Sequence, residues 1–445
     1  MTIDALYDIF LRHPSIQTDT RKLKQGDLYF ALKGANFNGN HFAVKALEMG
    51  AAYAIIDETP KGDDMPPPYH ADRLIPVEDV LTTLQELALY HRKQFDIPFI
   101  AITGSNGKTT TKELVHAVLA STYITYTTVG NLNNHIGIPL TLLSVKKDAQ
   151  FAVIEMGANH QKEIEGYCRY TLPTHGIITN AGKAHLEGFG GPEGVKKGKG
   201  ELYDFLRSDK VPTPNGGTAF VMWDYDYLRE MSRGIPHIIR YGTQDADITG
   251  ATESNASSSL LQVGILRGAP IEPIHTQLVG DYNLPNVLAA VAVGHHFGVS
   301  AYNIKQAIEA YTPSNSRSQL IIKDGNHIIL DAYNANPSSM RAAITNFARM
   351  VVDSAAPKIL ILGAMAELGA ESLSEHEGII QLIGEYPWAD VVLVGGDFQK
   401  IKHTYKRFDN SKEAAQWLKS AGLKDTYLLI KGSLSTKMEE VLSNA

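Results

Sequence analysis

The sequence predicts an α/β protein of three domains, in which helices cover sheets that are mostly parallel. The first observation is a series of short, nearly continuous apolar runs, such as residues 99–102 and 151–154, which alternate with helical patterns. Runs of this kind are typical of strands buried on both faces of a parallel sheet. The second is a similar alternation after residue 326, and the third is the length of 445 residues, which fits about three domains.

The N-terminal unit is expected to span residues 1–96. Its strands are predicted at residues 27–32 and 52–56, and a helix at 78–95, where apolar side chains recur along one stripe. The segment 60–70 holds four prolines and is expected to be an exposed loop. Together these elements predict a small α/β domain.

The central unit, residues 97–311, opens with the strand 99–102 and a glycine-rich turn into a helix. The turn and the start of the helix consist of Gly104, Ser105, Asn106, Gly107, Lys108, Thr109 and Thr110. Backbone N–H groups in such a turn can surround phosphate oxygens at the positive end of the helix dipole. Lys108 adds a charge for the outer phosphates, and Thr109 a hydroxyl for Mg²⁺. Ile102 occupies the place of the usual first glycine. The order of strand, loop and helix nevertheless predicts a nucleotide-phosphate site, and an ordinary strand–helix turn is the alternative.

Two further strands of the central unit end in polar residues. The runs 151–154 and 176–179 are followed by Glu155 and Asn180. Ligands of open parallel sheets bind beyond the carboxyl ends of the strands, so we expect these side chains to converge with the phosphate loop. Residues 245–275 predict a peripheral antiparallel piece, and residues 287–296 a well-packed helix.

The third unit, residues 312–445, follows a polar linker that contains proline. Its strands are predicted at residues 327–330, 358–362, 391–394 and 427–430, with helices such as 339–351 between them. The alternation indicates a Rossmann-like sheet. Its glycine-rich turns do not form a dinucleotide fingerprint, so only the architecture, and not dinucleotide binding, is predicted.

Composition restricts the class of function. Lys and Arg total 41 against 48 Asp and Glu, a net charge of −7, which argues against nucleic acid as the main partner. The first residues show no signal peptide, and no run approaches the roughly 20 apolar residues of a membrane span. Cys168 is the single cysteine, which excludes an internal disulfide and a cysteine-rich metal site. A cytoplasmic protein is expected.

Three residues of the central unit are candidates for chemistry, two of them near strand ends and one in a basic run, and each has a structural alternative. Glu155 can supply a carboxylate oxygen to Mg²⁺, or it can satisfy nearby backbone N–H groups. His185 is an unusual Mg²⁺ ligand, and a hydrogen-bonded loop histidine is the favoured interpretation from the residues alone. Lys199 lies in the run KKGKGE, for which a solvated basic segment is favoured, and its two glycines weaken a helix.

Three residues of the third unit are candidates for nucleotide binding. Asp331 ends a strand and can accept a hydrogen bond from a ribose hydroxyl. Asp331 and Asn334 can equally be turn formers in a polar loop. Arg317, in the linker, can reach phosphate across a cleft, or it can be a surface arginine.

Taken together, the motifs resemble the ATP-dependent Mur ligases of peptidoglycan synthesis over nearly the whole chain. In the first unit the resemblance rests on TDTR at 18–21 and GDLYFALKG at 26–34, and in the second on TGSNGKTT at 103–110. Further motifs are GNLNNHIGIPL at 130–140, EMGANH at 155–160, DAYNANP at 331–337 and LGAMAELG at 362–369. Within the family, the likeness is to members that add D-alanyl-D-alanine to a UDP-linked tripeptide.

The resemblance implies roles for individual residues. The Mg²⁺ ligands would be Thr109, Glu155, His185 and a carbamylated Lys199, holding two ions, and the catalytic residues Lys108, Lys199 and His185. ATP would also contact Asn283 and Asn286 at the adenine, Asp331 at the ribose, Arg317 at the phosphates and Asn334. The UDP-linked substrate would contact Thr20, Arg21, Lys33, Asn131 and Asn134. The three units become a UDP-substrate domain, an ATP-binding domain and a domain for the incoming dipeptide.

The resemblance also implies the reaction and its partners. ATP would phosphorylate the carboxylate of UDP-N-acetylmuramoyl-tripeptide, and the amine of D-alanyl-D-alanine would attack the acyl phosphate. A monomer is expected. Three departures from the family pattern are Tyr282 in place of His, Gly198 in place of Ala and Leu434 in place of Arg. The alternatives are a sister ligase, including folylpolyglutamate-type enzymes, and a P-loop ATPase switch or silent nucleotide-binding module.

Overall fold

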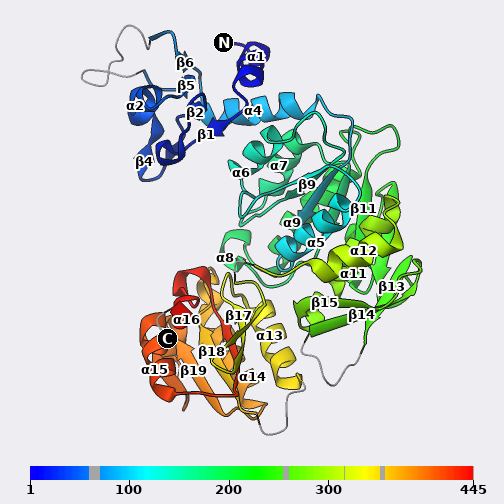
Figure 1. Ribbon diagram of the computed structural model, residues 1–445, viewed down its shortest axis with the longest axis vertical. Coiled ribbons are helices and arrows are strands. Elements are labelled where there is room, and N and C mark those ends of the chain that lie inside the picture. The colour runs from blue at the N-terminus through cyan, green and yellow to red at the C-terminus, as the bar shows by residue number, and fades with distance from the viewer. Residues whose placement is uncertain (60–70, 254–259, 315, 351–355, 444–445) are drawn as a thin grey trace.

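The computed structural model describes residues 1–59, 71–253, 260–314, 316–350 and 356–443. Three separate sheets follow one another along the chain, with the N-terminal and C-terminal sheets on the same side of the large central one (Figure 1). The predicted α/β class is confirmed. The expected proline-rich loop at 60–70 lies outside the described residues.

The N-terminal sheet has four parallel strands in the order β1-β2-β5-β6. The strands are β1 (Ile16–Gln17), β2 (Leu28–Phe30), β5 (Tyr53–Ile56) and β6 (Leu74–Pro76), and a short hairpin pairs β3 (Lys33–Gly34) with β4 (Phe37–Asn38). The helices are α1 (Ile3–Arg12), η1 (Thr20–Lys22), η2 (Gly39–Phe42), α2 (Ala43–Glu48) and α4 (Val80–Arg92). Asp79 begins α4 by accepting a hydrogen bond from the Thr82 N–H at 2.6 Å.

Helix α4 joins the N-terminal sheet to the central domain. The buried guanidinium of Arg92 donates to the backbone oxygens of Thr171 (2.8 Å) and Leu172 (2.9 Å), at the C-terminal end of helix α7 (Glu163–Thr171). It also lies 3.8 Å from the ring centre of Phe99. A cation at a helix C-terminus is stabilised by the helix dipole and satisfies carbonyls that the helix leaves unpaired. Burial lowers the pKa of Arg92 to about 10.

The central sheet has nine strands in the order β15-β14-β13-β12-β11-β10-β7-β9-β8, and β14 pairs antiparallel with both of its neighbours, β13 and β15. The strands are β7 (Phe99–Thr103), β8 (Thr125–Thr127), β9 (Phe151–Glu155), β10 (His175–Ile178), β11 (Thr218–Met222), β12 (His237–Gly242), β13 (Ile248–Thr252), β14 (Leu260–Arg267) and β15 (Ile274–Val279). The predicted peripheral antiparallel piece is therefore present. Strand β7 lies between β10 and β9, so the carboxyl ends of three strands meet beside the phosphate loop.

Helices cover this sheet along its length. They are α5 (Lys108–Ala120), α6 (Gly137–Leu143), α7, α8 (Leu186–Phe189), α9 (Pro192–Leu206), α10 (Asp226–Met231), η4 (Asp281–Asn283), α11 (Leu284–His296) and α12 (Ala301–Ala310). Helix α11, predicted at 287–296, starts three residues earlier because Pro285 sits in its first turn. Helices α5 and α11 pack against each other. None of the helices in the described part of the chain is long and apolar enough to cross a membrane.

The C-terminal sheet has the order β16-β17-β21-β18-β19-β20, with only the edge strand β16 antiparallel. The strands are β16 (Gln319–Lys323), β17 (Asn326–Asp331), β18 (Lys358–Gly363), β19 (Asp390–Val394), β20 (Lys406–Phe408) and β21 (Tyr427–Lys431). The helices are α13 (Pro337–Arg349), η5 (Gly369–Glu371), α14 (Ser372–Gly384), η6 (Gly396–Lys400), α15 (Ser411–Ala421), η7 (Leu434–Thr436) and α16 (Glu440–Ser443). The predicted helix 339–351 is α13, and Val351 lies outside the described residues.

Alternate residues of these strands face two different cores. Ile329 and Leu429 join the core that includes α13 and α14, whereas Ile328, Leu428 and Ile430 join the core of α15 and α16. Because successive side chains of a strand point to opposite faces, the sheet is covered on both sides. This is the Rossmann-like architecture that the sequence predicts.

One buried histidine predicts how the fold responds to acid. His175 begins β10 among the rings of Phe220, His296 and Phe297. Burial, and then the charges of His296 and His237, lower the pKa of His175 to about 3. Since the unfolded chain binds this proton near pH 6.5 and the folded chain does not, stability should fall as the pH drops from 6.5 toward 3.

Replacing His175→Phe should make the pH dependence of unfolding shallower by at most about 1.4 kcal/mol per pH unit across this interval. Urea unfolding at several pH values measures the slope. His41→Gln, at an exposed position, is the control for removing one histidine from the chain. Equal slopes for His175→Phe and the unchanged chain would contradict the interpretation.

Candidate active site

The phosphate loop connects β7 to α5 through two glycines with positive φ. Gly104 has φ +145°, and a Cβ there would lie 2.0 Å from Thr179 Oγ1. Gly107 has φ +79°, and a Cβ there would lie 2.6 Å from Asn286 Oδ1. Both backbone conformation and space therefore require glycine at these positions. Helix α5 begins directly afterwards, at Lys108.

The residues after β10 hold the loop in place. Asn180 accepts from the N–H of Ser105 through its backbone oxygen (2.9 Å) and from the N–H of Asn106 through its side chain (3.0 Å). Thr179 Oγ1 donates to the backbone oxygen of Asn106 at 2.6 Å. The expected convergence of Asn180 with the loop is present, and its part there is to brace the loop.

Lys108 folds back over the loop. Its Nζ donates to the backbone oxygens of Gly104 (2.8 Å) and Ser105 (3.2 Å). Burial lowers the pKa of Lys108, the negative charge of Glu155 opposes the shift, and the positive charge of Arg317 adds to it. The pKa of the loop lysine therefore depends on a carboxylate of the central domain and on an arginine of the linker, as well as on burial.

Glu155 ends β9 with its side chain buried. Its Oε1 accepts from Asn133 Nδ2 at 2.7 Å, whereas its Oε2 has no hydrogen-bond partner among the described residues. The structural alternative, a carboxylate that satisfies backbone N–H groups, does not describe this arrangement. A buried carboxylate oxygen without a partner costs about 1–3 kcal/mol or more, so it requires an explanation. A hard cation that prefers oxygen ligands fits this position.

Lys199 is only 1 % exposed, within the uninterrupted helix α9. The solvated basic run favoured from the residues alone is therefore wrong for this lysine. Its Nζ donates to the backbone oxygen of Ala158 at 3.1 Å and lies 5.0 Å from the ring centre of Phe189. Burial first, and then the charge of Lys108, hold the pKa of Lys199 well below its usual value. The same ring explains why position 198 is glycine, because a Cβ there would lie 2.4 Å from Phe189 Cε1.

His185 precedes α8 with φ +51°, an uncommon conformation for a residue with a side chain. Its Nδ1 contacts Glu367 Oε2 of the C-terminal domain. This hydrogen bond holds the pKa of Glu367 below its usual value.

Thr109 is buried in the first turn of α5. Within the described residues no three His, Cys, Asp or Glu side chains gather as a metal site, so Glu155 and His185 would need further donors.

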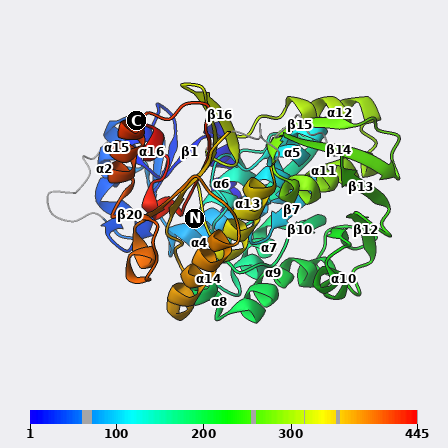
Figure 2. The same ribbon diagram turned by 90° about the horizontal axis from the view of Figure 1, so that it is seen from below.

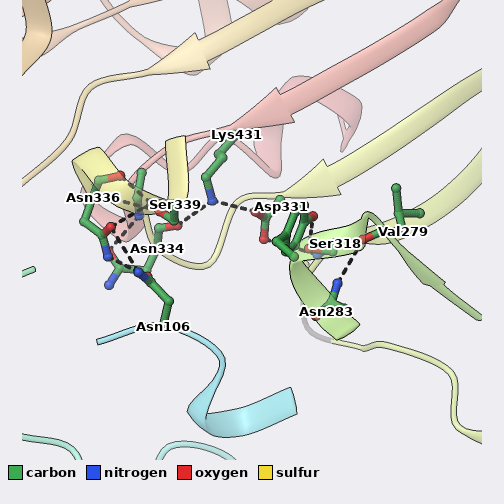
Figure 3. Close-up of polar contacts among 11 residues, drawn as sticks. Asn106, Val279, Asn283, Ser318, Asp331, Asn334, Asn336, Ser339 and Lys431 are labelled. Atoms are coloured by element: carbon green, nitrogen blue, oxygen red, sulfur yellow. Dashed lines mark hydrogen bonds and ion pairs between the residues drawn. The ribbon is translucent and has the colours of Figure 1, made fainter. Parts of the chain in front are cut away.

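Asp331 is held by a buried lysine of the neighbouring strand. Lys431 Nζ donates to Asp331 Oδ2 (2.5 Å) and to the backbone oxygen of Asn334 (3.1 Å), and Ser318 N–H donates to Asp331 Oδ1 (3.1 Å; Figure 3). Asn334 Oδ1 accepts from the N–H of Ala335. The side chains of Asp331 and Asn334 therefore both accept hydrogen bonds from backbone N–H groups, as the turn-forming alternative predicted. Arg317 lies 3.5 Å from the ring centre of Tyr333.

The predicted adenine residues form a buried hydrogen-bonded chain. Asn283 Nδ2 donates to the backbone oxygen of Val279, Asn286 Nδ2 donates to Asn283 Oδ1, and Thr111 Oγ1 donates to Asn286 Oδ1. This chain links α11 to the helix that follows the phosphate loop. Tyr282 OH is hydrogen-bonded to Ser318 Oγ at 2.9 Å, which ties the central domain to the linker. Burial raises the pKa of Tyr282.

The phosphate loop also contacts the C-terminal domain directly. Asn336 Nδ2 donates to Asn106 Oδ1 at 2.7 Å, while Asn336 Oδ1 accepts from Ser339 and caps α13 (Figure 3). Nearby, Ser338 Oγ accepts from the backbone N–H of Lys183 at 3.0 Å. The central and C-terminal domains therefore meet at the loop itself.

The predicted contacts of the UDP-linked substrate come from two domains, with Thr20, Arg21 and Lys33 in the N-terminal domain and Asn131 and Asn134 in the central one. Arg21 pairs with Asp19, whose pKa its hydrogen bond lowers to about 2, and Lys33 pairs with Glu58 (2.7 Å) and Asp57 (3.0 Å). The remaining candidates are Thr20 at the start of η1, the exposed Asn131, and Asn134, whose Oδ1 accepts from the N–H of Gly137 at 2.9 Å.

The structure adds residues that sequence reasoning did not select. Each of them is hydrogen-bonded to a predicted site residue: Asn133 to Glu155, Asn336 to Asn106, Lys431 to Asp331 and Glu367 to His185. Asn133, Asn336 and Glu367 lie inside the motifs that carry the family resemblance, so their positions in these motifs could have identified them as candidates. Lys431 ends an apolar strand, as Glu155 and Asp331 do.

A phosphate loop that faces a second, Rossmann-like domain defines a P-loop nucleotide-binding protein built around an interdomain site. Three family models match: "Mur ligase family, catalytic domain" at residues 14–92, "Mur ligase middle domain" at 102–294 and "Mur ligase, glutamate ligase domain" at 316–434. The chain belongs to the Mur ligase family, as its motifs predicted.

Individual relatives cover almost the entire chain. The UDP-N-acetylmuramoyl-tripeptide–D-alanyl-D-alanine ligase of Bacillus subtilis is 33% identical, with 96% of this chain and 92% of the relative covered. The enzyme of the same name from Escherichia coli is 35% identical with the same coverage. A crystal structure of MurF from Acinetobacter baumannii superposes with a TM-score of 0.83 at 31% identity, covering 97% of this chain and 92% of that one.

Replacing Gly107→Ala should destabilise the loop by about 1–2 kcal/mol from backbone conformation alone, with further cost from the contact with Asn286. Gly166→Ala provides a matched control in α7, because a Cβ at Gly166 meets nothing within 4 Å. That control should raise stability slightly, since alanine favours a helix by about 1 kcal/mol over glycine. Thermal melting and ATP binding by calorimetry measure both variants. Unchanged ATP affinity in Gly107→Ala would contradict the assigned loop geometry.

Proposed function

We propose that this protein uses ATP to join D-alanyl-D-alanine to UDP-N-acetylmuramoyl-tripeptide, giving the pentapeptide precursor of peptidoglycan, ADP and phosphate. The observation that carries the proposal is the phosphate loop with Lys108 set beside a buried carboxylate, Glu155, that has an oxygen without a partner in the described residues. The relatives named above, similar over almost the full chain, support the choice of substrates.

ATP would be held by groups from both domains. The phosphate loop and the start of α5 (Gly104, Ser105, Asn106, Gly107, Lys108, Thr109 and Thr110) would surround its phosphates. Because the N–H groups of Ser105 and Asn106 donate to Asn180, the N–H donors to phosphate would come from the other residues. The adenine would lie near Asn283 and Asn286, and the ribose near Asp331 and Asn334. Lys108 and Arg317, whose charges already influence each other, would neutralise charge on the transferred phosphoryl group.

Mg²⁺ fits the oxygen of Glu155 that lacks a partner in the described structure. The residues that would hold it are Thr109, Glu155, His185 and a carbamylated Lys199. Mg²⁺ supplies charge neutralisation between phosphate oxygens when it is bound. The two-ion arrangement implied by the resemblance belongs to the same proposal.

Carbamylation requires Lys199 as a free amine, and its surroundings supply one. The lowered pKa leaves Nζ unprotonated over a wider pH range, so the nitrogen lone pair can attack CO₂. A N–C bond forms, a proton leaves to solvent, and the lysine becomes an anionic oxygen donor. Carbamylation would therefore convert a buried amine near Lys108 into a negatively charged group that attracts Mg²⁺.

The two other substrates would approach from the flanking domains. Residues 1–96 would hold the UDP part through Thr20, Arg21 and Lys33, with Asn131 and Asn134 from the central domain, residues 97–311. Residues 312–445 would take the dipeptide and close on ATP. Leu434 stands where an arginine is common in the family and is 60 % exposed, so it would offer the dipeptide an apolar surface in place of a positive charge. We propose a monomer that acts in the cytoplasm, where the single, buried Cys168 stays reduced.

In the proposed reaction, an oxygen of the tripeptide carboxylate attacks the γ-phosphorus of ATP, and the bond to ADP breaks. The amine of the dipeptide then attacks the acyl carbon, loses a proton, and the tetrahedral intermediate expels phosphate. The protein's contribution is to align three substrates and to stabilise the charge that moves.

The direct test measures phosphate release from ATP with UDP-N-acetylmuramoyl-tripeptide, with and without D-alanyl-D-alanine. Release that requires both, together with formation of the pentapeptide by mass spectrometry, is the expected result. Release without either substrate would indicate an ATPase switch. Release with another amine, such as a single amino acid, would indicate a sister ligase.

Lys108→Ala should reduce turnover by at least about 100-fold, because it removes the charge at the transferred phosphoryl group. The melting temperature should stay close to that of the unchanged chain, since Lys108 Nζ contacts only backbone oxygens of its own loop in the described structure. Steady-state phosphate release and thermal melting measure the two effects. Activity near the unchanged level would overturn the phosphate-site assignment.

Lys199→Ala should abolish activity that short carboxylates, such as acetate or formate, partly restore by occupying the space of the carbamate. Lys196→Ala, which removes a lysine paired with Glu193 on the same helix, should keep its activity and show no response to carboxylate. Phosphate release at increasing carboxylate concentration measures rescue. Absence of rescue in a folded Lys199→Ala protein would count against the carbamate.

A further inference from the structure

His185 and Glu367 meet across the interface between the central and C-terminal domains. His185 precedes α8, and Glu367 lies in the loop between β18 and η5. Figures 1 and 2 both place α8 at the edge of the C-terminal domain, and α8 is in contact with η5. The following inference rests on the proposed function, because it concerns how His185 would serve the divalent cation.

The backbone on both sides is shaped to make this contact. His185 has φ +51° and Glu367 has φ +59°, so two residues with side chains adopt left-handed conformations opposite each other. Such conformations are uncommon and cluster at functional sites. Gly369 allows the two segments to approach, because a Cβ there would lie 3.2 Å from the Cβ of Glu187. The His185–Glu367 contact is therefore part of a tightly fitted interface.

The chemistry of the contact determines which nitrogen of His185 is available. A carboxylate only accepts hydrogen bonds, so Nδ1 carries the hydrogen that points to Glu367 Oε2. In a neutral imidazole the lone pair is then on Nε2. No hydrogen bond to Nε2 occurs within the described parts of the chain. A carboxylate on the second nitrogen is the usual partner of a metal-binding histidine, where it fixes the tautomer and the ring orientation.

We propose that Glu367 is a positioning residue for the cation site, and that it makes cation binding depend on the docked C-terminal domain. The central domain supplies the ligands, whereas the carboxylate that orients His185 comes from the other side of the interface. Because coupling between two equilibria is reciprocal, cation binding should in turn favour the docked arrangement.

A neighbouring interdomain contact allows this role to be separated from simple domain docking. Lys183, two residues before His185, pairs with Glu375 of the C-terminal domain. That ion pair joins the same two domains, with Glu375 in helix α14, and its partners within the described residues include no proposed cation ligand. Lys183→Met therefore weakens docking without altering the partner of His185.

The experiment measures binding of Mn²⁺ to the full chain with ADP present, from the electron paramagnetic resonance signal of free Mn²⁺. Glu367→Ala should weaken Mn²⁺ binding about 10- to 100-fold. Glu367→Gln keeps an oxygen acceptor for Nδ1 and should restore most of the affinity. Lys183→Met should weaken Mn²⁺ binding less than Glu367→Ala does, because it weakens docking but leaves the partner of His185 in place. Thermal melting verifies that each variant is folded.

Unchanged Mn²⁺ affinity in a folded Glu367→Ala protein would overturn the inference while leaving the proposed function intact. An equal loss in Lys183→Met and Glu367→Ala would also overturn it, since docking alone would then explain the effect. If the unchanged chain retains ADP but binds no Mn²⁺ beyond that held by free ADP, the proposed cation site itself fails, and the inference fails with it.

Discussion

The position of the phosphate loop is the constraint on which the rest of the site depends. Hydrogen bonds from Ser105 and Asn106 to Asn180 fix the loop to the end of β10. On its other side, Asn286 contacts Gly107 and Thr111, and thereby joins α11 to α5. These contacts leave little freedom for the backbone between β7 and α5, so its N–H groups keep one arrangement before any ligand arrives.

The same loop also determines where the C-terminal domain sits. Asn106 is bonded to Asn336, and Asn336 caps α13, so one amide belongs to both a phosphate loop and a helix N-terminus. Lys431 holds the segment that carries Asn336 through Asp331 and the backbone of Asn334. Hydrogen bonds as well as the linker therefore connect the loop to the C-terminal sheet.

Charge explains why the site suits a polyphosphate. Lys108, Lys199 and Arg317 bring positive charge to a partly buried region in which Glu155 supplies the opposite sign. Burying like charges is costly, and the lowered pKa values of the two lysines express that cost. Phosphate groups would relieve it at Lys108, and carbamylation would relieve it at Lys199. In the proposed function, the cation would then give the buried oxygen of Glu155 a partner.

The sequence predicted the three sheets and the phosphate loop because apolar runs, glycines and strand ends are local signals. From its neighbours alone, the sequence predicted that Lys199 lies in solvent. The two glycines beside it appear to weaken a helix, but Gly198 leaves room for the Phe189 ring and Gly200 lies beside Met231. The contacts of Glu367 with His185 and of Asn336 with Asn106 join residues more than 180 positions apart. No periodicity reports such pairs, and only the packing of two domains reveals them.

The central claim is that the phosphate loop directs the γ-phosphoryl group of ATP to a carboxylate. It is tested most directly with UDP-N-acetylmuramoyl-tripeptide whose terminal carboxylate carries ¹⁸O. Acyl-phosphate chemistry transfers one carboxylate oxygen to phosphate, so mass spectrometry of the released phosphate should find one ¹⁸O atom for each pentapeptide formed. Pentapeptide formation with unlabelled phosphate would contradict the account, because the carboxylate would then have been activated by a route that does not pass through phosphoryl transfer.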